Sequence, residues 1–195
     1  MFLKDYISGL DKKYRKVFFS GISFESSRVK KDNIFFAIKG DKFDGNDYID
    51  EAISRGASVI ISEKQISKKK KNIIYLNSLN IRKVLAEISY KIFKDKPKKL
   101  VAVTGTNGKS SVTDFYFQIL NLNLKKVASI GTIGVRYQNK KKKLTNTTLD
   151  PIQLGKILKN LKKKKIEYLI MEASSHGLKQ NRLDGLLFVI GIFTN

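Results

Sequence analysis

The sequence predicts an α/β protein built on parallel β-sheets. Short apolar runs alternate with segments of helical periodicity, a glycine turn follows one strand-like run, and several runs end in polar residues. The 195 residues, 42% of them hydrophobic, suffice for one large core or two small ones. A charged stretch containing a proline, KDKPKK at 94–99, interrupts the apolar pattern. We therefore expect a small amino-terminal α/β domain at 1–95 and a second, parallel-sheet domain at 96–195.

Five elements are expected in the first domain. Apolar runs predict strands at 33–40, 58–62 and 72–76, and helical spacing predicts helices at 48–58 and 81–93. Gly56 is expected near the end of the first helix.

The second domain is expected to continue the alternation of strands and helices. Apolar runs predict strands at 99–105, 127–134, 167–175 and 186–195. A helix is expected at 111–120, with a buried stripe of Val112, Phe115, Tyr116, Ile119 and Leu120. Another helix is expected to start after Asp150, which would cap it, with Pro151 at its first position and Gln153 at its third.

The chain is strongly basic, with a formal net charge of +22. The lysines gather in runs at 68–71, 140–143 and 162–165, without interleaved aromatic residues that could stack on bases. We interpret these runs as solvated surface that attracts phosphorylated substrates in general, not as a specific nucleic-acid site. A basic nucleic-acid-binding module remains an alternative. Salt-dependent RNA binding that survives Lys109→Ala and outcompetes ATP would favour it.

Other classes are excluded by composition. Cysteine is absent, so the chain forms no disulfide framework and no thiolate metal site. No apolar run approaches the roughly 20 residues of a membrane span, and the amino terminus lacks the apolar centre of a secretion signal. We expect a cytoplasmic monomer with no membrane partner.

The stretch VTGTNGKSS at 103–111 predicts a phosphate-binding loop. It follows an apolar strand and precedes a helix, so its backbone N–H groups and the helix dipole would face an anion. Lys109 could reach the outer phosphates of ATP, and Ser110 could coordinate Mg²⁺. The usual P-loop has its first glycine where Val103 stands, so only the shorter pattern G-x-x-G-K-S is present. The predicted ATP site consists of Gly105, Thr106, Asn107, Gly108, Lys109, Ser110 and Ser111.

A second candidate site follows another predicted strand, in LIMEASSHG. Glu172 would stand at the carboxyl end of this strand, where α/β proteins bind ligands and where a carboxylate suits Mg²⁺. His176 is the single histidine of the chain and lies four residues beyond Glu172. We expect His176 to be a metal ligand or a neighbour of the metal.

Four stretches resemble the Mur ligases, the amide-forming enzymes of peptidoglycan synthesis. TGTNGKSS resembles their ATP loop, and residues 26–49, SSRVKKDNIFFAIKGDKFDGNDYI, resemble the uridine-nucleotide domain of MurE and MurF. TNTTLD at 145–150 and MEASSHGLKQNRLDGLLFVIGIFTN at 171–195 resemble the MurE branch in particular. The resemblance implies that 1–95 is a UDP-MurNAc-binding domain. Residues 96–195 would be the first part of a P-loop-type, ATP-binding central domain.

The resemblance also implies roles for individual residues. Lys109, Glu172 and His176 would serve catalysis, and Ser110, Glu172 and His176 would lie at Mg²⁺. The uridine nucleotide would contact Ser27 and the turn Asp41, Lys42 and Phe43, although ESSR departs from the more usual D-S-R. The muramoyl-peptide would contact Asn146, Thr147, Thr148, Ser174, Gln180 and Arg182.

The implied reaction is ATP-dependent addition of a diamino acid to UDP-N-acetylmuramoyl-L-alanyl-D-glutamate. The D-glutamyl carboxylate would be phosphorylated by ATP, and the amine of the diamino acid would displace phosphate. The added residue could be meso-diaminopimelate or L-lysine. A MurF or a folylpolyglutamate synthase is the alternative within the superfamily, and a panel of muramoyl and pteroyl substrates would separate them.

Family members continue beyond the position of Asn195, through a modified lysine at the metal and a third domain that binds the amino acid. The 195-residue chain is therefore expected to be an amino-terminal fragment that binds nucleotide weakly and does not complete the ligation. Chromatography of a reaction with ATP, the muramoyl-dipeptide and diaminopimelate should show no tripeptide product. Detectable tripeptide would contradict this expectation.

Overall fold

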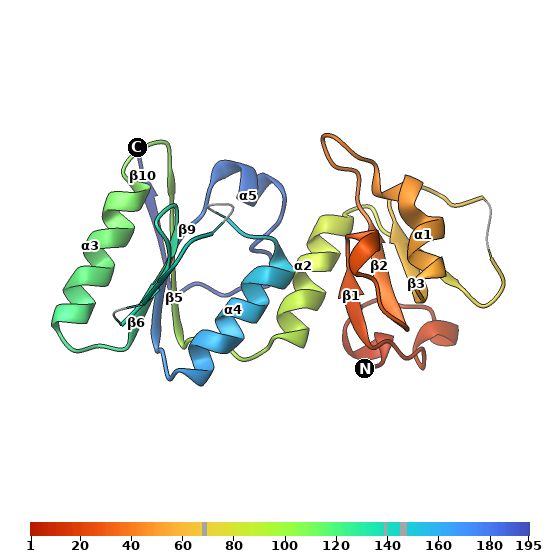
Figure 1. Cartoon of the computed structure of the whole chain (residues 1–195), viewed down its shortest axis with the longest axis horizontal. Helices are drawn as coiled ribbons and strands as arrows, with labels where there is room; N and C mark the ends of the chain where they lie inside the picture. The colour runs from red at the N-terminus through yellow and green to blue at the C-terminus, as the bar shows by residue number, and fades with distance from the viewer. Residues whose placement is uncertain (68–69, 139, 145–147) are drawn as a thin grey trace. The chain divides into compact units, whose positions relative to one another are not determined.

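The computed structural model describes residues 1–67, 70–138, 140–144 and 148–195 (Figure 1). The chain divides into two compact units, Met1–Ile88 and Ser89–Asn195, whereas the sequence places the boundary after residue 95. Within the described ranges, no helix combines the length and apolar character needed to cross a bilayer.

The first unit is built on a four-stranded parallel sheet of order β1-β2-β3-β4. Its strands are β1 (Gly21–Ser23), β2 (Asn33–Ala37), β3 (Ala57–Ser62) and β4 (Ile74–Asn77). The α-helices are α1 (Ile49–Ser54) and α2 (Ile81–Ile92), of which α2 extends past the end of the unit. Four 3-10 helices complete the described part of the unit, η1 (Leu3–Asp5), η2 (Lys12–Tyr14), η3 (Ser26–Arg28) and η4 (Gly45–Tyr48). The three strands and two helices expected here are confirmed, while β1 was not predicted.

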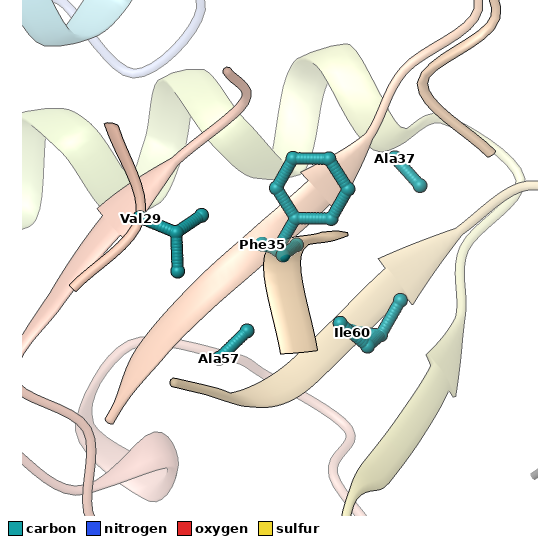
Figure 2. Packing of buried hydrophobic residues seen from close by; sticks show 6 residues of the cluster. Val29, Phe35, Ala37, Ala57 and Ile60 are labelled. Atoms are coloured by element: carbon teal, nitrogen blue, oxygen red, sulfur yellow. The ribbon is translucent and has the colours of Figure 1, made fainter. Parts of the chain in front are cut away.

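Part of the core of the first unit lies where α1 covers β2 and β3. All five residues of β2 are buried, because side chains on both faces of this central strand are covered. One cluster joins Val29, Phe35, Ala37, Ala57 and Ile60 with Ala52 of α1 (Figure 2). Phe35 has no exposed surface and stands opposite Ile60 in the strand register.

The second unit contains a six-stranded sheet of order β10-β5-β9-β6-β7-β8. The first four strands in this order pair in parallel, and the last two pair antiparallel. They are β5 (Lys99–Gly105), β6 (Val127–Gly131), β7 (Gly134–Tyr137), β8 (Lys140–Lys142), β9 (Tyr168–Glu172) and β10 (Ile190–Thr194). The α/β class with parallel sheets is therefore confirmed, with an antiparallel edge that was not predicted.

Two longer helices flank this sheet, α3 (Lys109–Leu122) on one face and α4 (Pro151–Lys163) on the other (Figure 1). The predicted cap of α4 is confirmed, because the Asp150 carboxylate accepts the N–H groups of Ile152 at 3.0 Å and Gln153 at 2.9 Å. A short helix, α5 (Ser175–Lys179), follows β9. The predicted strand at 167–175 therefore ends earlier, at Glu172, since Ser174 caps α5 by accepting the N–H of Gly177.

The predicted strand at 127–134 is wrong in its second half. β6 ends at Gly131, and β7 begins at Gly134 and runs back antiparallel, with these two glycines opposite each other. Thr132 and Ile133 form the two-residue turn between them. Two-residue loops are the commonest hairpin connections, but they usually carry glycine, asparagine or aspartate within the loop. Thr132 and Ile133 give no such signal, so the sequence IGTIG read as part of one strand.

The predicted buried stripe of α3 is also partly wrong. Phe115 is 62% exposed and Ile119 is 57% exposed, whereas Thr113 and Phe117 are buried. Val112 and Tyr116 of the predicted stripe do pack on the sheet, against Val101, Val103 and Ile170. Beside them, the guanidinium of Arg136 in β7 lies 4.5 Å from the centre of the Phe117 ring.

Replacing Phe35 by alanine should destabilise the first unit by about 3–5 kcal/mol, because it leaves a cavity between β2 and α1. Hydrogen exchange of the β2 and β3 amides measures this effect locally. Phe43→Ala is the matched control, since Phe43 is 69% exposed and should change exchange little. Equal effects of the two changes would contradict the assigned core.

Candidate active site

The carboxyl ends of four parallel strands meet at one edge of the larger sheet. Thr194 of β10 stands opposite Gly105 of β5, and Glu172 of β9 stands opposite Val103 of β5. Met171, one residue before Glu172, stands opposite Ile130 of β6. The strand register therefore brings the glycine loop, Glu172 and the β6–β7 turn to the edge at which open α/β sheets bind ligands.

The loop after β5 presents unpaired backbone donors to solvent. Gly108 takes a left-handed conformation with φ of 78°, and α3 begins at the next residue. Within the part of the chain that the structure describes, no acceptor is found for the N–H groups of Gly108, Lys109, Ser110 or Ser111. Thr106, Asn107 and Gly108 are exposed. These N–H groups and the helix dipole form the kind of site that binds phosphate.

The carbonyl groups of the same loop are occupied by protein donors. The Lys109 ammonium donates to the carbonyls of Gly105 at 2.6 Å and Thr106 at 2.9 Å. The Thr194 hydroxyl hydrogen-bonds to the carbonyls of Thr104 and Asn107. The loop therefore directs its carbonyls to the protein, leaves donors for an anion, and carries the Lys109 charge beside them.

Gly105 allows β10 to approach the loop closely. Its φ of +135° is unfavourable for other residues, and a Cβ atom here would lie 1.8 Å from the carbonyl oxygen of Thr194. A side chain at position 105 would separate the loop from β10.

Glu172 is a buried carboxylate, with 2% of its surface exposed. Oε1 accepts the Thr132 N–H at 3.1 Å and Oε2 accepts the Thr132 hydroxyl at 2.9 Å. Among the described residues, no cationic side chain forms an ion pair with Glu172. Because an unpaired buried carboxylate is costly, this arrangement suits a bound divalent cation.

The two other predicted metal ligands are placed differently. Ser110 lies half-buried in the first turn of α3, and His176 lies exposed in α5. The His176 ring forms no hydrogen bond with any described residue. In the same part of the chain, no group of three or more histidine, cysteine, aspartate or glutamate side chains could hold a metal ion. A cation at Glu172 would therefore need hydroxyl, phosphate or water oxygens as well, as Mg²⁺ commonly does.

Four predicted substrate residues gather beside Glu172. The hydroxyls of Thr148 and Ser174 lie 3.0 Å apart, and the Ser174 N–H donates to Thr148 Oγ1 at 3.0 Å. The Arg182 guanidinium donates to the Thr148 carbonyl and, from Nη2 at 2.7 Å, to Gln180 Oε1. Asn146 and Thr147 lie outside the described residues.

The candidate uridine site lies on the first unit. Ser27 is exposed in η3, which follows β1, and Asp41, Lys42 and Phe43 are exposed in a turn after β2. Since β1 and β2 are parallel, both segments leave the same edge of the smaller sheet. The Gly40 N–H donates to the Phe43 carbonyl at 2.8 Å, which closes the turn. In the described chain, no hydrogen bond joins Ser27 to this turn.

Sequence reasoning missed the residues that anchor this turn. Asp44 Oδ2 accepts the Lys64 ammonium at 2.6 Å, and Asp44 Oδ1 accepts the Asn46 N–H at 2.9 Å. Lys64 and Asn46 hold the pKa of the Asp44 carboxyl well below its ordinary value, so the anchor stays ionised. Ser62, at the end of β3, donates to Asn46 Oδ1 at 2.7 Å. The D-G-N sequence was the available signal, because aspartate and asparagine commonly bond to nearby backbone in turns.

Thr132 and Thr194 were also missed. Each threonine lies at or just after the end of a strand next to the loop or Glu172. A hydroxyl at the carboxyl end of a parallel strand was the available signal.

Two family models match adjoining parts of the chain. The model described as "Mur ligase family, catalytic domain" matches residues 19–102, and "Mur ligase middle domain" matches residues 103–195.

Two curated relatives with similar sequences carry the same name. A UDP-N-acetylmuramoyl-L-alanyl-D-glutamate–2,6-diaminopimelate ligase of Rickettsia conorii is 44% identical over 182 residues, covering 90% of this chain and 37% of the relative. A ligase of the same name from Buchnera aphidicola subsp. Schizaphis graminum is 40% identical over 185 residues, covering 91% and 37%. The chain thus spans little more than a third of these relatives.

A solved structure supports the fold over the whole chain. It is titled as a UDP-N-acetylmuramoyl-L-alanyl-D-glutamate–2,6-diaminopimelate ligase and is similar with a TM-score of 0.80 at 27% identity. The similarity covers 100% of this chain and 40% of that one.

Replacing Gly105 by alanine should destabilise the second unit by about 2 kcal/mol or more, because the backbone conformation is strained and Cβ meets β10. Urea unfolding followed by circular dichroism measures the loss. Gly191→Ala on β10 is the matched control, since a Cβ there meets nothing within 4 Å. If both variants unfolded like the unmodified chain, the close approach described here would be wrong.

Proposed function

The chain belongs to the Mur ligase family, and from this premise we propose that the protein is an ATP-dependent, ADP-forming ligase of the MurE type. It would add 2,6-diaminopimelate to UDP-N-acetylmuramoyl-L-alanyl-D-glutamate in peptidoglycan synthesis. One observation supports this proposal above all. The N–H groups at the start of α3, which have no acceptor among the described residues, lie at the same sheet edge as the buried Glu172 carboxylate. The names of relatives at 40–44% identity supply the substrates.

The glycine loop is the proposed site of the ATP phosphates. The N–H groups from Gly108 to Ser111 would bind phosphate oxygens, and Lys109 would turn from the loop carbonyls to the outer phosphates. Ser110 and Glu172 would hold Mg²⁺, with His176 nearby. When bound, Mg²⁺ supplies positive charge that offsets the charge on the phosphates.

The chemistry proposed for this edge requires two anions to meet. The free D-glutamyl carboxylate attacks the γ-phosphorus of ATP, the bond to the bridging oxygen breaks, and ADP leaves. The amine of diaminopimelate then attacks the acyl phosphate, loses a proton and displaces inorganic phosphate. The loop donors and Lys109 lower the repulsion in the first step, and positioning supplies much of the remaining rate gain. No covalent bond to the protein is needed.

The network around Thr148 is the proposed muramoyl-peptide site. Thr148, Ser174, Gln180 and Arg182 are linked beside Glu172, and an arginine fork suits an anionic peptide. Asn146 and Thr147 are assigned to the same site by resemblance.

The uridine nucleotide is proposed to bind the first unit, at Ser27 and the turn Asp41, Lys42 and Phe43. The exposed ring of Phe43 offers a face for stacking on the base. We further propose a cytoplasmic monomer that uses small-molecule substrates and no specific nucleic acid or membrane.

The substrate panel tests this proposal on the protein as its gene encodes it in full. ADP release should require both the muramoyl-dipeptide and diaminopimelate, and Lys109→Ala should lower it by about 100-fold or more because the first step loses its cation. Lys140→Ala, in the exposed strand β8, is the matched control and should retain activity. ADP release with a pteroyl substrate, or without the muramoyl-dipeptide, would overturn the assignment.

A further inference from the structure

Among the described residues, the Glu172 carboxylate is held by Thr132 alone. Thr132 donates its backbone N–H to Oε1 at 3.1 Å and its hydroxyl to Oε2 at 2.9 Å. A carboxylate offers about four acceptor positions, so each oxygen keeps capacity for another ligand. The Thr132 bonds thereby fix the plane of the carboxylate without occupying it completely.

Gly131 makes this arrangement possible. A Cβ atom at residue 131 would lie 2.2 Å from Glu172 Oε1 and 2.5 Å from its Cδ. Glu172 therefore lies directly against the β6 backbone, where the next residue in the chain can reach both of its oxygens.

The turn that carries Thr132 is itself tied to the helix of the phosphate loop. Arg136 of β7 pairs with Asp114 of α3, and its Nε donates to Ser129 Oγ of β6 at 3.2 Å. Both members of the ion pair are largely buried, with 19% and 24% of their side-chain surfaces exposed. The ion pair and the hairpin together set the position of Thr132 relative to the start of α3.

We propose that Thr132 is a positioning residue that holds the Glu172 carboxylate for a divalent cation shared with the nucleotide phosphates. The inference rests on the proposed function, because it assigns the cation to that site. Outer partners of metal ligands typically change metal affinity by 10–100-fold when they are removed. Every substitution at position 132 keeps the backbone N–H that bonds to Glu172. Losing the hydroxyl alone should therefore weaken metal affinity by an amount at the lower end of this range.

The test measures Mn²⁺ binding by electron paramagnetic resonance in the presence of ADP, on the protein as its gene encodes it in full. Thr132→Val should weaken Mn²⁺ binding about tenfold, and Thr132→Ser should restore it to within about twofold. ADP binding in EDTA and the melting temperature should stay unchanged. Thr132 is exposed at a turn, its hydroxyl donates to Glu172, and among the described hydrogen bonds none joins it to the phosphate loop. Thr132→Ala is a second variant, should valine disturb the turn.

Thr113→Val is the matched control. Thr113 is 4% exposed on α3, and its hydroxyl has no partner among the described residues. This isosteric change therefore removes a buried hydroxyl without removing a bond, and Mn²⁺ affinity should not change.

The results distinguish the positioning role of Thr132 from the proposed function. If the unmodified protein binds Mn²⁺ with ADP and Thr132→Val or Thr132→Ala binds it equally well, the positioning role is overturned alone. Equal weakening by the serine and valine variants overturns it as well, since the hydroxyl would not matter. If the unmodified protein binds no Mn²⁺ with ADP, the proposed function fails and the inference fails with it.

Discussion

The close approach of β10 to the loop after β5 is the constraint on which the candidate site depends. Gly105 permits it, and the Thr194 hydroxyl uses it to reach the carbonyls of Thr104 and Asn107. The bond from Thr194 to the Asn107 carbonyl fixes that peptide, so the Gly108 N–H on its other side points away from Thr194. The Asn107 N–H is itself held by the Asn195 carbonyl, which ties the loop further to the end of β10. The N–H groups of Lys109, Ser110 and Ser111 find no acceptor among the described residues because they lie in the first turn of α3, and Lys109 adds charge beside them.

The same edge of the sheet also holds the buried carboxylate of Glu172. Burying an unpaired carboxylate is unfavourable, and the two bonds from Thr132 offset only part of that cost. The fold retains Glu172 there nonetheless, one strand from the phosphate loop. A cation shared between the carboxylate and the phosphates would lower the energy of both anions, and it would give Glu172 the ion-pair partner that no cationic side chain of the described residues supplies.

Much of the fold could be predicted because strong periodic signals are local. The run at 99–105 became β5 with the same bounds, and the Asp150 cap formed as its sequence indicated. The hairpin at Gly131 and Gly134 was missed because its turn residues lie within one continuous apolar run. The rotation of α3 was misjudged because apolar residues occur around most of the helix, and Arg136, which contacts Phe117, comes from a distant strand.

The candidate site could likewise be predicted only where its residues lie close together in the sequence. The loop at 105–111 and Glu172 are each indicated by a short local sequence pattern. Thr132 and Thr194 act through contacts with distant residues, which form only after the strands pair. The muramoyl-peptide residues came from resemblance, since nothing in the polar stretch around Thr148 predicts its bonds to Ser174 and Arg182.

Binding of nucleotide phosphates by the backbone donors at the start of α3, opposite Glu172, can be followed through amide chemical shifts in a ¹⁵N-labelled protein titrated with ADP and Mg²⁺. Saturable downfield shifts are expected for the amides of Gly108, Lys109, Ser110 and Ser111, because each would gain an anionic acceptor. Saturable shifts confined to other residues, with these four unchanged, would contradict it.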